Sequence, residues 1–192
     1  SRSVDSGETW EQTSIRVSPL EVISTTFPQV DAGDPGRIAI TYLGSENSSE
    51  LGEPDIDGEN WTGNAHYATT NVSYHLYITI SLNALDPSPV FHTFRVTDDP
   101  VQIGSICLNS GDCRDIGGSN RNLLDFNDLH IDRDGRVFVA FADGCTDSCA
   151  SDSNSTAEDS RSRRGSMYYL GSGPSLYEAV GMMEMPDQIK IE

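Results

Sequence analysis

The strongest constraint on the fold is a repeat: residues 27–43 and 126–142 align without a gap, at an offset of 99 residues. Each copy has an alternating stretch, a turn rich in Asp and Gly, and a second alternating stretch, which predicts a β-hairpin. The matched pairs are Phe27 and Phe126, Val30 and Leu129, Gly36 and Gly135, Ile38 and Val137, Ile40 and Val139, and Tyr42 and Phe141. Internal repetition of this kind indicates a repeat fold.

Further strands are predicted after each hairpin. Residues 73–82 place Tyr, Leu and Ile side chains on one face and mostly polar ones on the other. A short apolar stretch, 91–96, follows a Pro-rich turn and completes four strands. After the second copy, 166–170 and 176–180 are the candidates for its third and fourth strands.

Residues 3–10 read Ser-Val-Asp-Ser-Gly-Glu-Thr-Trp and fit S-x-D-x-G-x-T-W at each fixed position. This octapeptide resembles the Asp box, or BNR repeat, of the sialidase-like β-propellers. Asp5 and Gly7 suit a tight turn, because the carboxylate can accept backbone N–H bonds and glycine tolerates a positive φ. Ser3 and Thr9 can add hydroxyl bonds, and Trp10 is expected to be an apolar anchor beneath the turn. The motif predicts a folded corner and not a catalytic group.

The resemblance implies an all-β chain: a partial β-propeller of about two and a half four-stranded antiparallel blades, with long disulfide-bearing loops. By family precedent, residues 10–17 would be the last strand of the blade that carries the Asp box. The expected divisions are 1–26 as the end of that blade, 27–99 as a blade, 100–122 as a disulfide loop, and 123–192 as a second blade with a polar loop at 143–165.

This number of blades is too small to close a ring, since propellers close with about four to eight blades. We therefore expect the remainder of the same protein, or further subunits, to complete the propeller. Ser1 is not a natural start, so we expect the chain to begin after a cleavage or inside a longer polypeptide. A stand-alone β-sandwich with a similar number of strands is the alternative.

The charge of the chain limits its partners. There are 30 acidic residues and 12 basic ones, for a formal net charge of −18. Such a surface repels a phosphate backbone, which argues against a nucleic-acid partner. No stretch approaches the roughly 18 apolar residues of a membrane span, so membrane insertion is not expected. The acidity is interpreted as a device for solubility, with a cation-loading surface as the alternative.

Sequons and cysteines both favour an extracellular protein, secreted or on a cell surface. Four asparagines occupy N-x-S/T triplets: Asn47, Asn60, Asn71 and Asn154. The cysteines form two close pairs, Cys107 with Cys113 and Cys145 with Cys149. Of the three possible pairings, the local one is expected; a zinc cluster is the weaker alternative, because neither spacing resembles C-x2-C.

Calcium is the candidate cofactor. Asp55, Asp57 and Asn60 place oxygen ligands around a turn, as hard cations require. The loop differs from an EF-hand because Gly58 falls at its fourth position and no Glu closes it.

A catalytic site is not expected in this chain. Sialidases use three arginines, a Tyr/Glu pair and an Asp, and their first arginine lies in an Arg-Ile-Pro motif that is absent here. Arg37 and Arg136 occupy equivalent repeat positions, which suggests a shared structural role. Tyr177 and Glu178 are adjacent, so on a strand they would point to opposite faces.

Other groups also give no catalytic pattern. Asp128, like Asp125, flanks Phe126 and is interpreted as a solvated cap. The four histidines, His66, His75, His92 and His130, have no cluster or relay spacing.

The sequence thus predicts a glycosylated propeller module with a non-catalytic recognition or structural role, and carbohydrate is its candidate ligand. The alternatives are a sialidase-like exo-glycosidase whose catalytic residues lie mostly outside this chain, and a subunit of an extracellular polymer or filament.

Overall fold

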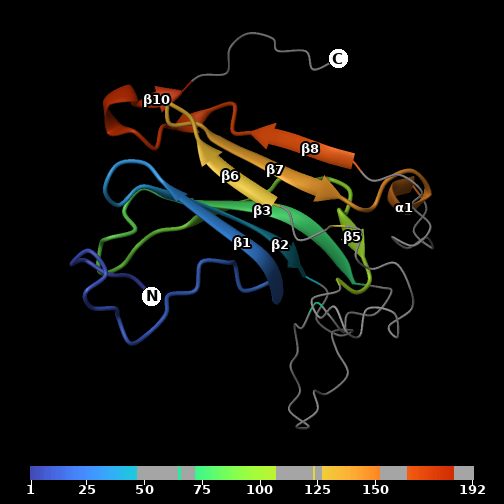
Figure 1. Ribbon diagram of the computed structural model, residues 1–192, viewed down its shortest axis with the longest axis horizontal. Coiled ribbons are helices and arrows are strands. Elements are labelled where there is room, and N and C mark those ends of the chain that lie inside the picture. The colour runs from blue at the N-terminus through green and yellow to red at the C-terminus, as the bar shows by residue number, and fades with distance from the viewer. Residues whose placement is uncertain (47–64, 66–71, 107–122, 124–126, 152–163, 184–192) are drawn as a thin grey trace.

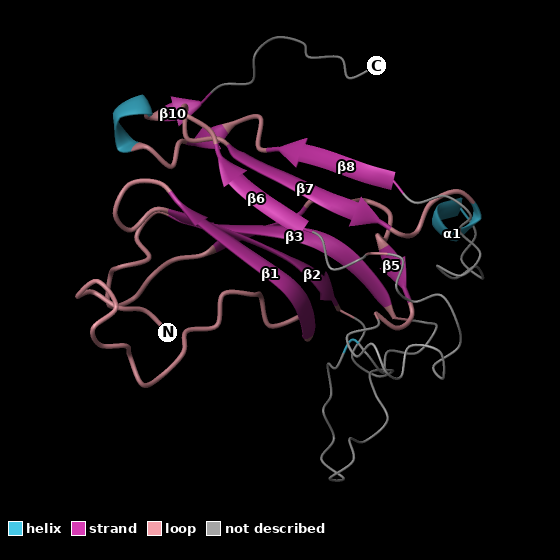
Figure 2. Cartoon of the chain, viewed as in Figure 1, coloured by secondary structure: helices cyan, strands magenta, loops and turns pink. Residues whose placement is uncertain are grey.

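The chain is an all-β protein of antiparallel sheets (Figures 1 and 2). The computed structural model describes residues 1–46, 65, 72–106, 123, 127–151 and 164–183. The strands are β1 (Ser24–Ala32), β2 (Ile38–Ser45), β3 (Ser73–Ser81), β4 (His92–Arg95), β5 (Gln102–Ile103), β6 (Asn127–Ile131), β7 (Val137–Asp143), β8 (Arg164–Tyr169), β9 (Gly173–Pro174) and β10 (Met182–Met183). The helical pieces are α1 (Ser148–Ser151) and the 3-10 turn η3 (Glu178–Val180).

The first sheet has the order β1-β2-β3-β4, with β5 paired to β3. The second sheet has the order β6-β7-β8, and β9 pairs with β10. Both predicted hairpins are confirmed: β1 pairs antiparallel with β2, and β6 with β7, in matching register, Val30 opposite Ile40 and Leu129 opposite Val139. The strands predicted at 73–82, 91–96 and 166–170 are present as β3, β4 and β8.

Two predicted strands are wrong. Residues 10–17 contain no strand, and the N-terminal segment runs as an irregular chain below the first sheet in Figure 1. Residues 176–180 form the end of a turn and η3 instead of a strand, because the backbone of Leu176 bonds to two hairpin turns and not to a ladder. The loop expected at 100–122 includes a short strand, β5, which sequence inspection missed.

The two sheets pack face to face, with the second above the first in Figure 1. Because opposed residues in an antiparallel pair share a face, the register assigns each side chain to a face. The first sheet contributes Ala39, Leu43, Leu76, Ile78 and Ile80 to the common core, and the second contributes Leu129, Ile131, Val137, Val139 and Phe141. This common core holds the two halves of the repeat together.

Each sheet also has an outer face, turned away from the common core. The outer face of the first sheet carries Val30, Ala32, Ile38, Ile40, Tyr42 and Tyr77. The outer face of the second sheet carries Asp128, His130, Phe138, Ala140, Met167 and Tyr169. In the part of the chain that the structure describes, no helix has the length and apolar character needed to cross a bilayer.

The edge strands of the two sheets are joined by a carboxylate. Asp31 Oδ2 on β1 accepts the N–H of Ile131 on β6 at 2.9 Å, and His130 Nδ1 lies 3.8 Å from the same oxygen. The side-chain amide of Asn127 donates to the Phe27 carbonyl oxygen at 3.4 Å. These bonds keep β1 and β6 side by side although they are about 100 residues apart.

Leu176 lies between the two hairpin turns of the repeat. Its carbonyl oxygen accepts the N–H of Asp34 at 2.9 Å, and its own N–H donates to the Gly135 carbonyl oxygen at 3.0 Å. The backbone at residues 175 and 176 lies very close to both turns. A Cβ on Gly33 would overlap the Leu176 carbonyl, and one on Gly135 would overlap Ser175 Oγ. The chain thus needs glycine at both turns to admit this segment.

Gly135 and its repeat counterpart Gly36 form a matched pair for testing this contact. Both have a positive φ, +79° and +83°, but a Cβ on Gly36 would meet no atom closer than 3.8 Å. We expect Gly36→Ala to lower the free energy of unfolding by about 1 kcal/mol, from backbone strain alone. Gly135→Ala adds overlap with Ser175 and should cost about 3 kcal/mol or more. Urea unfolding measures both, and equal losses would contradict the contact.

Candidate functional site

The N-terminal octapeptide folds into a turn held by its own side chains. Ser3 Oγ accepts the Gly7 N–H at 2.8 Å and donates to Asp5 Oδ1 at 2.7 Å. Asp5 accepts the Thr9 N–H at 2.9 Å and the Thr9 hydroxyl at 2.5 Å. Gly7 has φ +89°, a conformation that glycine adopts without strain. These are the bonds expected from the residue types at this spacing.

The role expected for Trp10 is wrong. Its side chain is 61% exposed, because residues 10–17 form no strand that would place it under the turn. Asp5 is stabilised locally instead: hydrogen bonds from Ser3 and then from Thr9 lower the pKa of its carboxyl to about 2. The turn is therefore a self-contained polar structure on the surface.

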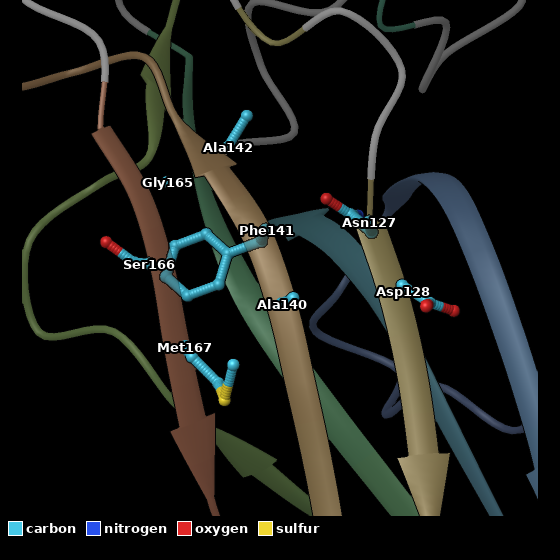
Figure 3. A pocket seen from close by; sticks show the side chains of 8 residues that line it. All are labelled: Asn127, Asp128, Ala140, Phe141, Ala142, Gly165, Ser166 and Met167. Carbon is cyan, nitrogen blue, oxygen red and sulfur yellow. The ribbon is translucent and has the colours of Figure 1, made fainter.

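An open depression of about 640 Å³ lies on the second sheet, and most of its lining residues belong to the outer face (Figure 3). Strands β6, β7 and β8 supply its lining, which consists of Asn127, Asp128, Ala140, Phe141, Ala142, Gly165, Ser166 and Met167. Asp128 is exposed, and its carboxylate accepts the N–H of the next residue, Leu129, at 3.0 Å. Asp128 is solvated, as the sequence suggested, but it is the second residue of β6 and not a cap before the strand.

The depression continues along the same face past Phe138 and His130, where its lining is almost entirely apolar. The rings of Phe138 and Tyr169 stack there with centroids 5.5 Å apart. The polar side chains that line this surface are Asn127, Asp128, His130 and Ser166. Among the described hydrogen bonds, none joins Asp128, His130 and Ser166 to one another. The chemistry of this face suits the binding of another apolar surface.

A second hollow, of about 520 Å³, lies between the N-terminal segment and the outer face of the first sheet. Its walls are mainly aliphatic and aromatic: Ile15, Val17, Val30, Ile38, Ile40, Leu85 and Phe91 take part. Arg2 borders it, but its guanidinium is bonded to Glu11 at 2.8 Å and to the Ala84 and Asp86 carbonyls. The hollow is thus an apolar surface without an available charge.

A tyrosine and a glutamate meet on the outer face of the first sheet. Tyr77 donates its hydroxyl to Glu46 at 2.6 Å and stacks on Tyr42. Burial raises the pKa of both tyrosines, so their hydroxyls stay protonated at neutral pH. Tyr77 is only 3% exposed, whereas Glu46 is exposed, so the pair lies at the edge of the buried region.

The arginines are used as structural donors. Arg37 donates to the Ser175 carbonyl at 2.9 Å, and Arg16 to the Val22 and Pro19 carbonyls. The Nε of Arg136 is buried with no hydrogen-bond partner within the described part of the chain. Tyr177 and Glu178 are not on a strand, and the Glu178 N–H donates to Asp34.

Several predicted site residues lie outside the described residues. They are the calcium candidates Asp55, Asp57 and Asn60, the sequons at Asn47, Asn60, Asn71 and Asn154, the pair Cys107 and Cys113, and Asp125 and His66. The local pairing expected for Cys145 and Cys149 is present as a disulfide that ties α1 to the end of β7. Across the described ranges, no group of three His, Cys, Asp or Glu side chains could hold a metal ion.

Sequence inspection missed the apolar outer face of the second sheet. The signal for it is the continuous run Val-Phe-Val-Ala-Phe-Ala at 137–142. A strand that is apolar on both faces is typical of a strand covered on both sides.

No protein family, curated protein or solved structure matches this chain.

The Asp5 turn predicts a specific titration. Because the folded-state pKa lies near 2, below the ordinary 3.8, the ionised carboxylate stabilises the fold above pH 3.8, and this contribution is lost as the pH falls through 2. We expect Asp5 to titrate near pH 2 by NMR. Ser3→Ala should raise that pKa toward 3.8, because it removes the hydrogen bond that lowers the pKa most. An unchanged pKa in this variant would contradict the assignment.

Proposed function

We propose that this chain is part of an extracellular, glycosylated β-propeller of the Asp-box type, with a non-catalytic recognition or structural role at a cell or particle surface. The observation that carries the proposal is that the two copies of the repeat form hairpins in two different sheets, and that these sheets pack on each other. Two hairpins of matching register lie in neighbouring antiparallel sheets, which pack face to face. Stacked four-stranded sheets around a centre are the architecture of a propeller.

The Asp-box turn supports the same assignment. Its Ser, Asp, Gly and Thr are bonded to one another, so each fixed position of the pattern except the Trp has a physical task in the turn. The side chains of this turn are satisfied internally. That arrangement favours a structural corner over a ligand-binding group.

The non-catalytic role is supported by the arginines, three of which are bonded to the main chain. Arg2, Arg16 and Arg37 donate to main-chain carbonyls, so they are not available as a cluster that grips a carboxylate. A recognition role fits the loops, since connections at the rims of such a scaffold are where binding residues concentrate. We propose carbohydrate as a candidate ligand and calcium as a candidate cofactor at Asp55, Asp57 and Asn60.

The extracellular assignment rests on the Cys145–Cys149 disulfide and the four sequons. Disulfides persist in oxidising compartments.

A sialidase-like exo-glycosidase is the second candidate. The observation that favours it is the hydrogen-bonded Tyr77–Glu46 pair, since a Tyr/Glu pair serves such enzymes as nucleophile and base. The burial of Tyr77 counts against it, because the tyrosine side chain is only 3% exposed and is stacked on Tyr42.

The two candidates are separated by a hydrolysis assay. We expect the intact glycosylated protein to leave a fluorogenic sialoside unhydrolysed, while a known sialidase run in parallel hydrolyses it. If hydrolysis occurs, Tyr77→Phe and Glu46→Gln would show whether this pair is responsible. Turnover in the wild-type protein would overturn the non-catalytic proposal.

The extracellular proposal is tested by mapping glycans on protein from a eukaryotic secretory host. We expect modification at Asn47, Asn60, Asn71 and Asn154, with Asn→Gln variants as matched controls at each site. Four unmodified sequons would count against export.

A further inference from the structure

The N-terminal segment, which precedes β1, covers only part of the outer face of the first sheet (Figure 1). Close to β1, its Val22 packs on Tyr42 and Tyr77, which are 2% and 3% exposed. The next residue, Ile23, donates its N–H to the Ser45 carbonyl oxygen at 2.9 Å. This end of the segment is therefore attached to the sheet and leaves no open surface over the two tyrosines.

The other end of the segment is held by Arg2. Its guanidinium donates from Nε to Glu11 Oε1 at 2.8 Å, and from Nη1 to the carbonyl oxygens of Ala84 and Asp86. Ala84 and Asp86 belong to the connection between β3 and β4. One side chain thus joins the segment to the sheet that it covers, and the segment is fixed at both ends.

Between these two attachments the segment stands away from the sheet and leaves the hollow of about 520 Å³. Val30, Ile38 and Ile40 line it from the outer face of the sheet, and Ile15 and Val17 line it from the segment. Val30 is 65% exposed and Ile15 is 37% exposed, so much of this apolar lining is open to a ligand. Covering such surface is favourable by about 25 cal/mol per Å².

The lining offers little to a charged ligand. Arg2 is the one charged side chain among the described lining residues, and Glu11 offsets its charge. Gln29 borders the hollow, but it lies opposite Thr41, so its side chain belongs to the other face of the sheet. The net charge of −18 also repels anions. An ion in the hollow would lose its hydration without gaining a partner, so the site selects a neutral ligand.

We propose that this hollow binds one neutral, mainly apolar small molecule between the N-terminal segment and the first sheet. Its volume of about 520 Å³ lies within the roughly 300–1,000 Å³ that is typical of small-molecule sites. The attached segment occupies the space that a helix or sheet of a protein partner would need, whereas a small molecule fits beneath it. This site does not depend on the propeller assignment, so its failure would leave the proposed function in place.

Fluorescence titration of the full chain with N-phenyl-1-naphthylamine tests the proposal, because this neutral probe gains emission in an apolar site. We expect the signal to saturate at one probe per chain. The anionic analogue 8-anilino-1-naphthalenesulfonate has the same rings and an added sulfonate. It should bind about tenfold more weakly or worse, because the hollow offers its charge no partner. Tighter binding of the sulfonate, or no saturable binding of the neutral probe, would overturn the proposal.

Variants locate the bound probe. Val30→Asp should weaken the binding of N-phenyl-1-naphthylamine by about tenfold or more, because it places a carboxylate in the apolar lining. Ala84→Trp should weaken it by filling the hollow, which Ala84 lines. Met167→Asp is the matched control: it introduces the same carboxylate at a side chain that is 63% exposed, in the depression on the second sheet.

Met167→Asp should bind the probe as tightly as the wild type. If it weakens binding as much as Val30→Asp or more, the probe binds the second sheet or both surfaces, and the proposal is wrong. Wild-type affinity in both Val30→Asp and Ala84→Trp would also overturn it. Circular dichroism of each variant confirms that the sheets are folded.

Discussion

The apolar contact between the two sheets is the interaction on which the rest of the structure depends. Burial of a Val, Leu, Ile or Phe side chain contributes about 1.5–3 kcal/mol, and the common core contains many of them from both halves of the repeat. Neither sheet could cover its own apolar face, because a sheet satisfies its hydrogen bonds in its plane and leaves its faces to be covered by another layer. The contact between repeats is therefore a requirement of folding.

Backbone bonds then fix how the two sheets are aligned. Leu176 bonds to both hairpin turns, and the Asp31 carboxylate bonds to the backbone of β6. Such bonds are directional, whereas apolar packing tolerates sliding. The glycines at the turns matter because a Cβ at Gly33 or Gly135 would occupy the space that the Leu176 segment needs. The packing thus supplies the stability, and these few polar contacts supply the alignment.

The surface follows from the same geometry. A strand such as β7, apolar on both faces, can bury only one of them in a two-sheet structure. Its other face remains as an apolar floor beside Asp128 and Met167. The polar groups that could have served catalysis are committed elsewhere: Arg37 to a carbonyl, Glu46 to a buried tyrosine. An apolar floor of this kind is suited to contact with another apolar surface.

The sequence by itself determined the local structures, which depend on residues that are neighbours along the chain. The period-two alternation at 73–82, the two hairpins of the repeat and the hydrogen bonds of the Asp5 turn follow from residues within a few positions of each other. Only the tertiary structure decided that Trp10 is exposed, that 176–180 is not a strand, and which face of β7 is buried. These outcomes depend on contacts between residues about 40 to 140 positions apart, such as Leu176 with Asp34 and Gly135. A local pattern carries no information on which of two apolar faces another sheet will cover.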